Sequence, residues 1–291
     1  MRSAKGGFSL LELIVVLAIM GFLVAMIAPR LAGVVGGAQR SADDTNISRL
    51  LQATSQFQER TGRLPAEMTN LVAETGPDEF VAPNVSNNDP GDGKEALSAD
   101  LAAVLPLHIH ILSDAEAAEL LRLGISEVRN FNPSEALDPL FNGIPAIAPS
   151  LERVPVVGGE TAVLMIGAGH GVGGWSDSLG ADDTILDPDF AYRIVLGYGQ
   201  DSELVTAGQL QGAAISPQGG NTENYLFNNY LLVLPRLAAT AQRNLPVPEV
   251  TAGSAGRVET FLLDEAQPVF DITVLSPEGR IFPPTQYWTI Q

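Results

Sequence analysis

The chain of 291 residues has no cysteine and is poor in basic residues. The lack of cysteine excludes disulfide bonds, thiolate metal sites, covalently attached c-type haem and cysteine nucleophiles. Only 16 Lys and Arg stand against 34 Asp and Glu, which gives a formal net charge of −18 at pH 7. Because such a charge repels polyphosphate backbones, the composition disfavours a nucleic-acid-binding protein.

What the chain does have is one long apolar run close to its start. Residues 8–28 form 21 consecutive positions in which Glu12 is the only charged residue. As a helix with about 1.5 Å rise per residue, this run spans roughly 30 Å, the thickness of a bilayer core. Arg2 and Lys5 precede it. This predicts a single-pass helix with its N-terminus in the cytoplasm and the rest of the chain on the other side of the membrane.

The carboxylate inside this run needs an explanation. Inserting Glu12 into a bilayer core would cost about 2 to 3 kcal/mol of free energy, and intramembrane carboxylates normally have a partner. The run is too long for an ordinary secretory signal, and Pro29 and Arg30 follow it where a small-residue cleavage site would be expected. The partner of Glu12 must therefore be created by processing or be supplied by another molecule.

The residues around this position carry a family resemblance. The junction reads Gly7, Phe8, Ser9, Leu10, Leu11 and Glu12, and a short basic leader, MRSAKGG, ends at it. It resembles the class III signal of type IV pilins and type II secretion pseudopilins. Gly21 and Pro29 also stand where members of that family commonly have a glycine and a proline.

The resemblance implies a processing and assembly route. A prepilin peptidase would cleave between Gly7 and Phe8, the new Phe8 amine would be methylated, and the apolar helix would stay in the mature protein. Glu12 would then pair with the Phe8 ammonium of a neighbouring subunit. Loss of Arg2 and Lys5 leaves 14 basic and 34 acidic residues, a net charge of −20. Multivalent cations or salt would relieve the repulsion between such acidic heads.

We expect an α+β protein with three parts: a cleaved leader at residues 1–7, a long helix at residues 8–61 and a globular head at residues 62–291. Residues 8–28 of the helix would cross the membrane or form the filament core. Pro29 should kink or locally melt the helix. The second half of the helix should pack on the head through an apolar stripe, Ile47, Leu50, Leu51, Thr54 and Phe57.

The head should be a mixed α/β unit with a strand-rich C-terminal half, and a division near residue 150 stays open. Strands are expected at 107–112 and 127–131, on either side of a helix that opens at Ser113 and closes at Gly124. The length of this connection predicts that the two strands are parallel neighbours. Residues 82–94 read as an exposed loop. Further strands are expected at 161–166, 190–196, 230–234, 258–263 and 269–275, with a hairpin turn at 276–279.

Two patterns suggest sites, each with a simpler alternative. His108 and His110 alternate on the expected strand, and together with His170 they could bind zinc, although any half-buried strand produces such a pair. The spacing of Gly169, Gly171 and Gly174 fits a dinucleotide fingerprint. No apolar helical period follows it, so a glycine-rich surface loop explains it better.

An acidic segment is the one metal site that we predict. It consists of Asp177, Asp182, Asp183, Asp187 and Asp189. Carboxylate oxygens in a flexible loop suit calcium, although the spacing is not that of an EF-hand, and a merely solvated acidic loop is the alternative. No other cofactor is expected, and no residue pattern predicts an enzyme.

The resemblance thus predicts a structural subunit of a type IV pilus or of a type II secretion pseudopilus. Its partners would be copies of itself or related pilins, the prepilin peptidase and the inner-membrane assembly platform. The subunit would wait in the inner membrane and end in an extracellular or periplasmic filament. The alternative is a minor pilin or adhesin, whose large head would be a binding module.

Overall fold

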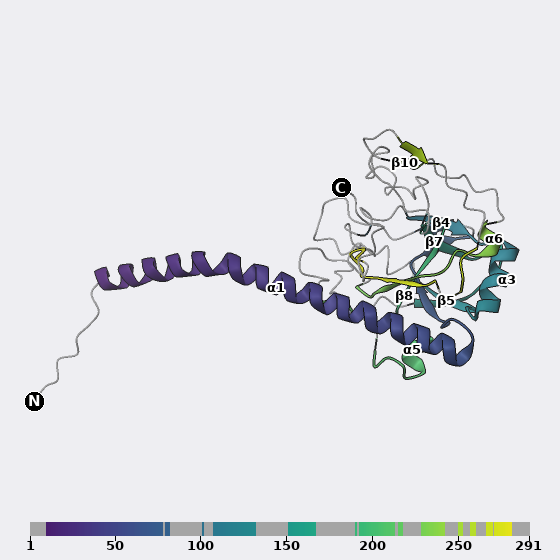
Figure 1. Ribbon diagram of the computed structural model, residues 1–291, viewed down its shortest axis with the longest axis horizontal. Coiled ribbons are helices and arrows are strands. Elements are labelled where there is room, and N and C mark those ends of the chain that lie inside the picture. Colours follow the sequence, from purple (N-terminus) through teal and green to yellow (C-terminus); the bar gives the residue numbers. More distant parts are fainter. Residues whose placement is uncertain are drawn as a thin grey trace, which may run out of the picture. The chain divides into compact units, whose positions relative to one another are not determined.

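The computed structural model describes most of the long helix and the core of the head (Figure 1). The described residues are 10–77, 79–81, 101, 107–131, 151–166, 190, 192–212, 215–217, 228–241, 250–252, 257–259, 266–269 and 271–280. They combine an N-terminal apolar helix with a strand-rich sheet in the rest of the chain. The α+β fold class expected from the sequence is thereby confirmed.

The first element is a single helix, α1 (Leu10–Thr61), of 52 residues. Leu, Ile, Val, Ala and Met fill its first half, and tertiary packing holds its second half. Its backbone is helical at Pro29 and on both sides of it, so the structure shows no local melting there. Gly62 ends the helix in a left-handed conformation, with a φ of 73°, and its amide donates to the Gln58 carbonyl at 2.8 Å.

The chain divides into two compact units, Met1–Ala42 and Asp43–Gln291. The boundary falls inside α1, so the second unit begins with helical residues. Strands before and after residue 150 belong to one sheet in this second unit.

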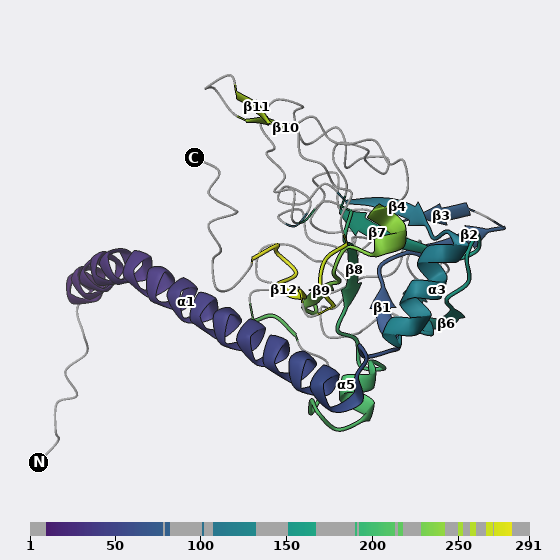
Figure 2. The ribbon, with the colours of Figure 1, turned by 45° about the vertical axis from the view of Figure 1, so that its right-hand side comes forward.

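Three sheets are present in the described part of the head (Figures 1 and 2). The main sheet has eight strands: β1 (Met68–Asn70), β4 (Leu107–Ile111), β5 (Glu127–Phe131), β6 (Leu151–Pro155), β7 (Ala162–Ile166), β8 (Ile194–Gly197), β9 (Leu231–Val233) and β12 (Thr273–Leu275). Two small hairpins accompany it, β2 (Ala73–Gly76) with β3 (Glu79–Val81), and β10 (Val250–Ala252) with β11 (Arg257–Glu259).

The strand order corrects one expectation. The main path is β12-β9-β8-β1-β5-β6, and β7 pairs with both β8 and β4. β5 has β1 as its parallel partner, with Val128 opposite Met68, whereas β4 runs antiparallel to β7. The prediction that residues 107–112 and 127–131 are parallel neighbours was therefore wrong. The connection between them is long enough for a crossover, but it does not fix which strand each one joins.

Three helices complete the described head: α3 (Asp114–Leu123), α5 (Glu203–Thr206) and α6 (Ala238–Ala241). α3 begins at a capping box in which Ser113 and Glu116 satisfy each other's backbone amides. It ends at Gly124, which has a φ of 98°. α3 and α6 lie side by side in both ribbon views (Figures 1 and 2).

The strands expected at 161–166 and 230–234 are present as β7 and β9, and both are fully buried. Those expected at 190–196 and 269–275 are shorter, and the turn at 276–279 is formed with Gly279 at a φ of 83°. Only β11 of the segment 258–263 is described, and the expected loop at 82–94 lies outside the described residues. The core joins β7, β8 and β9 to the second half of α1.

Candidate assembly helix and its anchorage

The first half of α1 presents apolar side chains in every direction. Its large apolar residues from Leu10 to Ile27 are 47% to 77% exposed. The segment Leu10–Ile27 is long and apolar enough to cross a membrane. Such a surface is stable only when lipid or other protein chains cover it on all sides.

Glu12 stands in the first turn of α1 and is exposed. A carboxylate at this place is favoured by the partial positive charge of the helix N-terminus. Gly21 is in open space, because an added Cβ would meet nothing within 4 Å. Contacts within the unit Met1–Ala42 therefore do not require a glycine at position 21. Pro29 lies within the helix, and the processing residues Gly7 and Phe8 lie outside the described residues.

The second half of α1 is anchored on the head by a buried stripe. Ile47, Leu50 and Phe57 are 0%, 3% and 4% exposed, and they recur at intervals of three and seven residues on one face of the helix. The polar residues Asp43 and Thr54 on the same face are fully buried as well. The sequence predicted Ile47, Leu50, Thr54 and Phe57 as members of this stripe, but not the buried polar residues Asp43 and Gln58, and the predicted Leu51 is only half-buried.

Each buried polar side chain of the stripe has a partner on the head. Asp43 accepts a hydrogen bond from the Tyr230 hydroxyl at 2.5 Å. Thr54 donates to the Leu50 carbonyl, so its oxygen is left to accept from the Tyr198 hydroxyl at 2.8 Å. Burial raises the pKa of Tyr198 well above its usual range, and the hydroxyl therefore stays protonated and able to donate.

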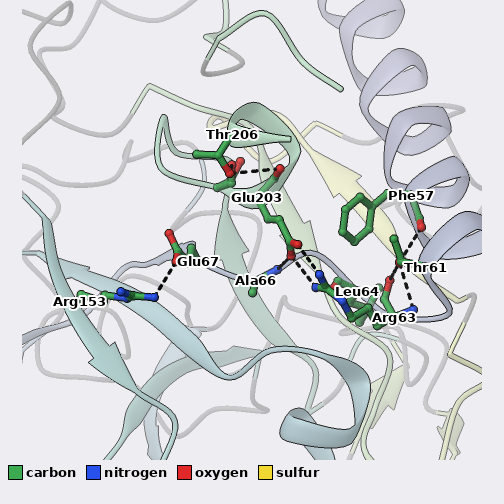
Figure 3. Close-up of polar contacts among 10 residues, drawn as sticks. Phe57, Thr61, Arg63, Leu64, Ala66, Glu67, Arg153, Glu203 and Thr206 are labelled. Atoms are coloured by element: carbon green, nitrogen blue, oxygen red, sulfur yellow. Dashed lines mark hydrogen bonds and ion pairs between the residues drawn. The ribbon is translucent and has the colours of Figure 1, made fainter. Parts of the chain in front are cut away.

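Where the chain leaves α1, an ion pair fixes the turn (Figure 3). The Arg63 guanidinium makes two parallel contacts to the Glu203 carboxylate, and that carboxylate also accepts from the Ala66 amide at 3.0 Å. The Glu203 amide donates back to the Ala66 carbonyl at 3.0 Å, and Arg63 covers the Phe57 ring at 5.3 Å. The hydrogen bond from Arg63 holds the pKa of Glu203 below its usual range.

This arrangement joins the end of α1 to α5 through backbone, charge and ring contacts together. Bidentate arginine pairs add geometric specificity as well as energy. Sequence reasoning did not identify Arg63 and Glu203 as partners. A pairing between positions so far apart in the chain leaves no local pattern.

A second buried cluster surrounds Glu116. Its carboxylate receives hydrogen bonds from the Ser113 amide and hydroxyl, both at 2.8 Å, and from the Thr240 hydroxyl at 2.8 Å. The His110 ring lies at 3.1 Å from both carboxylate oxygens. Burial raises the pKa of Glu116, but the hydrogen bonds from His110 and Ser113 outweigh this and hold the pKa far below its usual range.

The zinc hypothesis required His110 to act with His108 and His170. His110 instead faces Glu116, and His170 and the His108 side chain lie outside what the structure describes.

The glycine motif at 169–174 lies outside the described residues too. So do all five residues of the predicted calcium loop, Asp177, Asp182, Asp183, Asp187 and Asp189. Within the part of the chain that is described, no three His, Asp or Glu side chains form a group that could hold a metal ion. The calcium loop stays a prediction.

Comparison with known proteins gives two matches, both of limited extent. The family model described as the prokaryotic N-terminal methylation motif matches residues 2–28. The type II secretion system core protein G of Xanthomonas campestris pv. campestris is 33% identical over 78 residues, which are 26% of this chain and 52% of that protein. The chain thus spans about half the length of the curated relative it matches. No solved structure matches the chain.

Proposed function

We propose that the chain is a member of the family of type IV pilins and type II secretion pseudopilins, which its N-terminal segment resembles, and that it is a structural subunit of a helical filament. Residues 1–7 would be removed by a prepilin peptidase and the new amine of Phe8 methylated. The subunit would wait in the inner membrane with its head on the outer side. An assembly platform would then transfer it into an extracellular or periplasmic filament.

The observation that carries this proposal is the apolar surface of the Leu10–Ile27 segment, exposed on every side. A membrane anchor needs such a surface, and so does a helix that moves from lipid into a bundle of identical helices. Because each buried large apolar side chain contributes roughly 1.5 to 3 kcal/mol, covering this segment with neighbouring helices would outweigh any single polar contact. This burial of apolar surface would hold the filament together.

Glu12 would have a different task in that bundle. An ion pair between Glu12 and the methylated Phe8 amine of a neighbour would form away from water, where the desolvation penalty cancels much of the Coulomb attraction. Such a pair adds little to the association free energy of neighbouring helices. It does make every helix register in which the carboxylate lacks a cation less stable. We therefore assign Glu12 to register and Gly21 to the close approach of a neighbouring helix.

The test is to replace Glu12 with alanine in the full-length chain. We expect Glu12→Ala to insert into the membrane and to lose its leader normally, because neither step uses the carboxylate. The yield of sheared filaments should fall by at least about tenfold, since no register is then selected. Glu59→Ala is the matched control, because it removes an exposed carboxylate from the same helix outside the apolar segment.

Two results would count against the proposal. One is a normal filament yield from Glu12→Ala. The other is a mature protein that still begins at Met1 when its intact mass is measured, instead of at Phe8 with one added methyl group.

The size of the head favours a second candidate within the same family. The matched segment accounts for only 26% of the chain, so most of the head lies outside it. A minor pilin or adhesin would use such a head as a binding module. A principal subunit should dominate sheared filament material, whereas a tip protein should be present in only a few copies per filament, and quantitative mass spectrometry of that material separates the two.

A further inference from the structure

The charges of the chain are divided unevenly between the helix and the head. Residues 63–291 hold 10 of the 16 basic residues but 30 of the 34 acidic residues, a net charge of −20. Residues 8–62 hold four of each, and their net charge is zero. The head is therefore strongly acidic, and the helix is the part of the mature chain where basic residues are not outnumbered.

Most basic side chains of the described head already have a carboxylate partner within the chain. Arg63, Arg129, Arg153 and Arg280 each contact a carboxylate. Arg49 and Arg60 on α1 differ, because both are exposed and neither has a polar partner among the described residues. Within the described part of the chain, nothing covers these two guanidinium groups.

Arg49 and Arg60 also lie on the same side of the helix. They are 11 residues apart, which is close to three helical turns and places them about 16 Å apart along the axis. Gln52 and Gln56 stand between them at intervals of three and four residues, and both are exposed. We call Arg49, Gln52, Gln56 and Arg60 the arginine stripe. It faces away from the buried stripe that holds α1 on the head.

We propose that the arginine stripe is a docking surface for the acidic head of a second copy of this chain. Charge complementarity supports this occupant, since each copy combines a head of net charge −20 with the two arginines of the stripe, which have no carboxylate partner among the described residues. Carboxylates of one head placed on the stripe of its neighbour would offset part of the repulsion between acidic heads. Charge pairs of this kind select partner and register more than they add affinity. The inference rests on the proposed filament function.

A nucleic acid is the less suitable occupant. Its phosphates would meet two arginines but would be repelled by the rest of the acidic head. Gln52 and Gln56 suit a protein surface better, because an amide both donates and accepts hydrogen bonds whereas phosphate oxygens only accept them.

The experiment reverses the two charges in the full-length protein. We expect Arg49→Glu combined with Arg60→Glu to lower the yield of sheared filaments by at least about tenfold, because an acidic head would then face an acidic stripe. Arg122→Glu is the matched control, since Arg122 is an exposed arginine on α3 that has no polar partner among the described residues and lies off the stripe. It should change the yield by less than about twofold.

The outcomes separate this inference from the proposed function. Wild-type filaments together with a normal yield from the doubly reversed variant would overturn the inference and leave the function standing. A wild-type protein that never enters filaments would overturn the function itself. Leader cleavage and protease resistance of the head, both unchanged, show that the variant is processed and folded. If the variant does not fold, the neutral pair Arg49→Gln with Arg60→Gln replaces it, and its yield should still fall.

Crosslinking identifies the occupant. The natural chain has no cysteine, so Gln56→Cys introduces a single thiol in the centre of the stripe, where a photoreactive maleimide can be attached. Irradiation of assembled filaments should join this position to an acidic head segment of a second copy, and the product should disappear in the doubly reversed background. Adducts only with nucleic acid, lipid or a different protein would refute the second copy as the occupant.

Discussion

At the residue scale, Glu116 is the clearest case of a side chain whose role the sequence shows only in part. The spacing of Ser113 and Glu116 predicts the opening of α3, and the structure has both as a capping box. The contacts from His110 and Thr240 come from β4 and α6, and no local spacing reveals them. A capping residue has thus become the centre of a buried network, which the sequence could not indicate because His110 lies on a different element and Thr240 is distant in the chain.

Replacing the Glu116 carboxylate should change how the free energy of unfolding depends on pH. The pKa of Glu116 is lowered in the folded protein, so its stabilising contribution is present above its ordinary pKa of 4.5 and is lost as the pH falls through the folded-state pKa. We expect Glu116→Gln to lower the free energy of unfolding by about 3 kcal/mol at pH 7. The gap between wild type and variant should shrink below about pH 4.5.

Urea titrations of the detergent-solubilised protein at several pH values, followed by near-ultraviolet circular dichroism, measure this gap. Glu160→Gln is the control, because Glu160 is an exposed carboxylate, and it should leave the profile nearly unchanged. A gap that stays constant down to pH 3 would show that Glu116 does not stabilise the fold as an ion.

At the scale of elements, local signals and long-range pairings differ in how well the sequence predicts them. α3 begins and ends where Ser113 and Gly124 predict, because caps act within one turn. β1 was missed, since the chain enters it through Glu67 in a left-handed conformation with a φ of 57°, which a glutamate rarely adopts. β6 was missed as well, because its sequence LERVP is polar and ends in proline. The partners of β4 and β5 depend on the whole sheet, and the short segments themselves do not specify them.

The C-terminal end of α3 gives a test at this scale. Gly124 has a φ of 98°, and an added Cβ would lie 2.7 Å from the Cβ of Arg63. We expect Gly124→Ala to lower the free energy of unfolding by about 2 to 3 kcal/mol, from backbone strain and from displacement of Arg63. Gly159→Ala is the matched control, because its φ is 78° but its surroundings are open.

The Gly159→Ala control should lower the free energy of unfolding by only about 1 kcal/mol, the cost of placing alanine in a left-handed backbone conformation. Denaturant unfolding of both variants measures the difference. Equal losses would mean that the close approach of Arg63 to Gly124 contributes nothing.

At the scale of the whole molecule, α1 serves two units. The residues after the boundary at Asp43 supply Ile47, Leu50 and Phe57 to the core of the head. The part of the helix after this boundary is thus an integral part of the second unit. Periodicity predicted the packed apolar face, whereas the position of the boundary depends on tertiary contacts that the sequence does not display.

This division predicts where the chain can be cut. A fragment of residues 43–291 should be a soluble monomer with one cooperative unfolding transition, because it keeps the whole buried stripe. A fragment of residues 63–291 should aggregate, since removal of Ile47, Leu50 and Phe57 takes away at most about 5 to 9 kcal/mol of apolar burial. Size-exclusion chromatography and urea unfolding distinguish the two. A stable monomer from the shorter fragment would show that the head does not need the helix.

The polar contacts along the buried stripe have a mechanical consequence. Asp43, Thr54 and Gln58 hold the helix to Tyr230, Tyr198 and the Val269 carbonyl, at places spread over roughly 22 Å of its axis. A tensile force along the helix therefore loads these bonds simultaneously, in shear, instead of peeling them apart one after another. Bonds that share a load yield only when several break together, so the attachment should resist traction far better than the free energy of any one of them suggests.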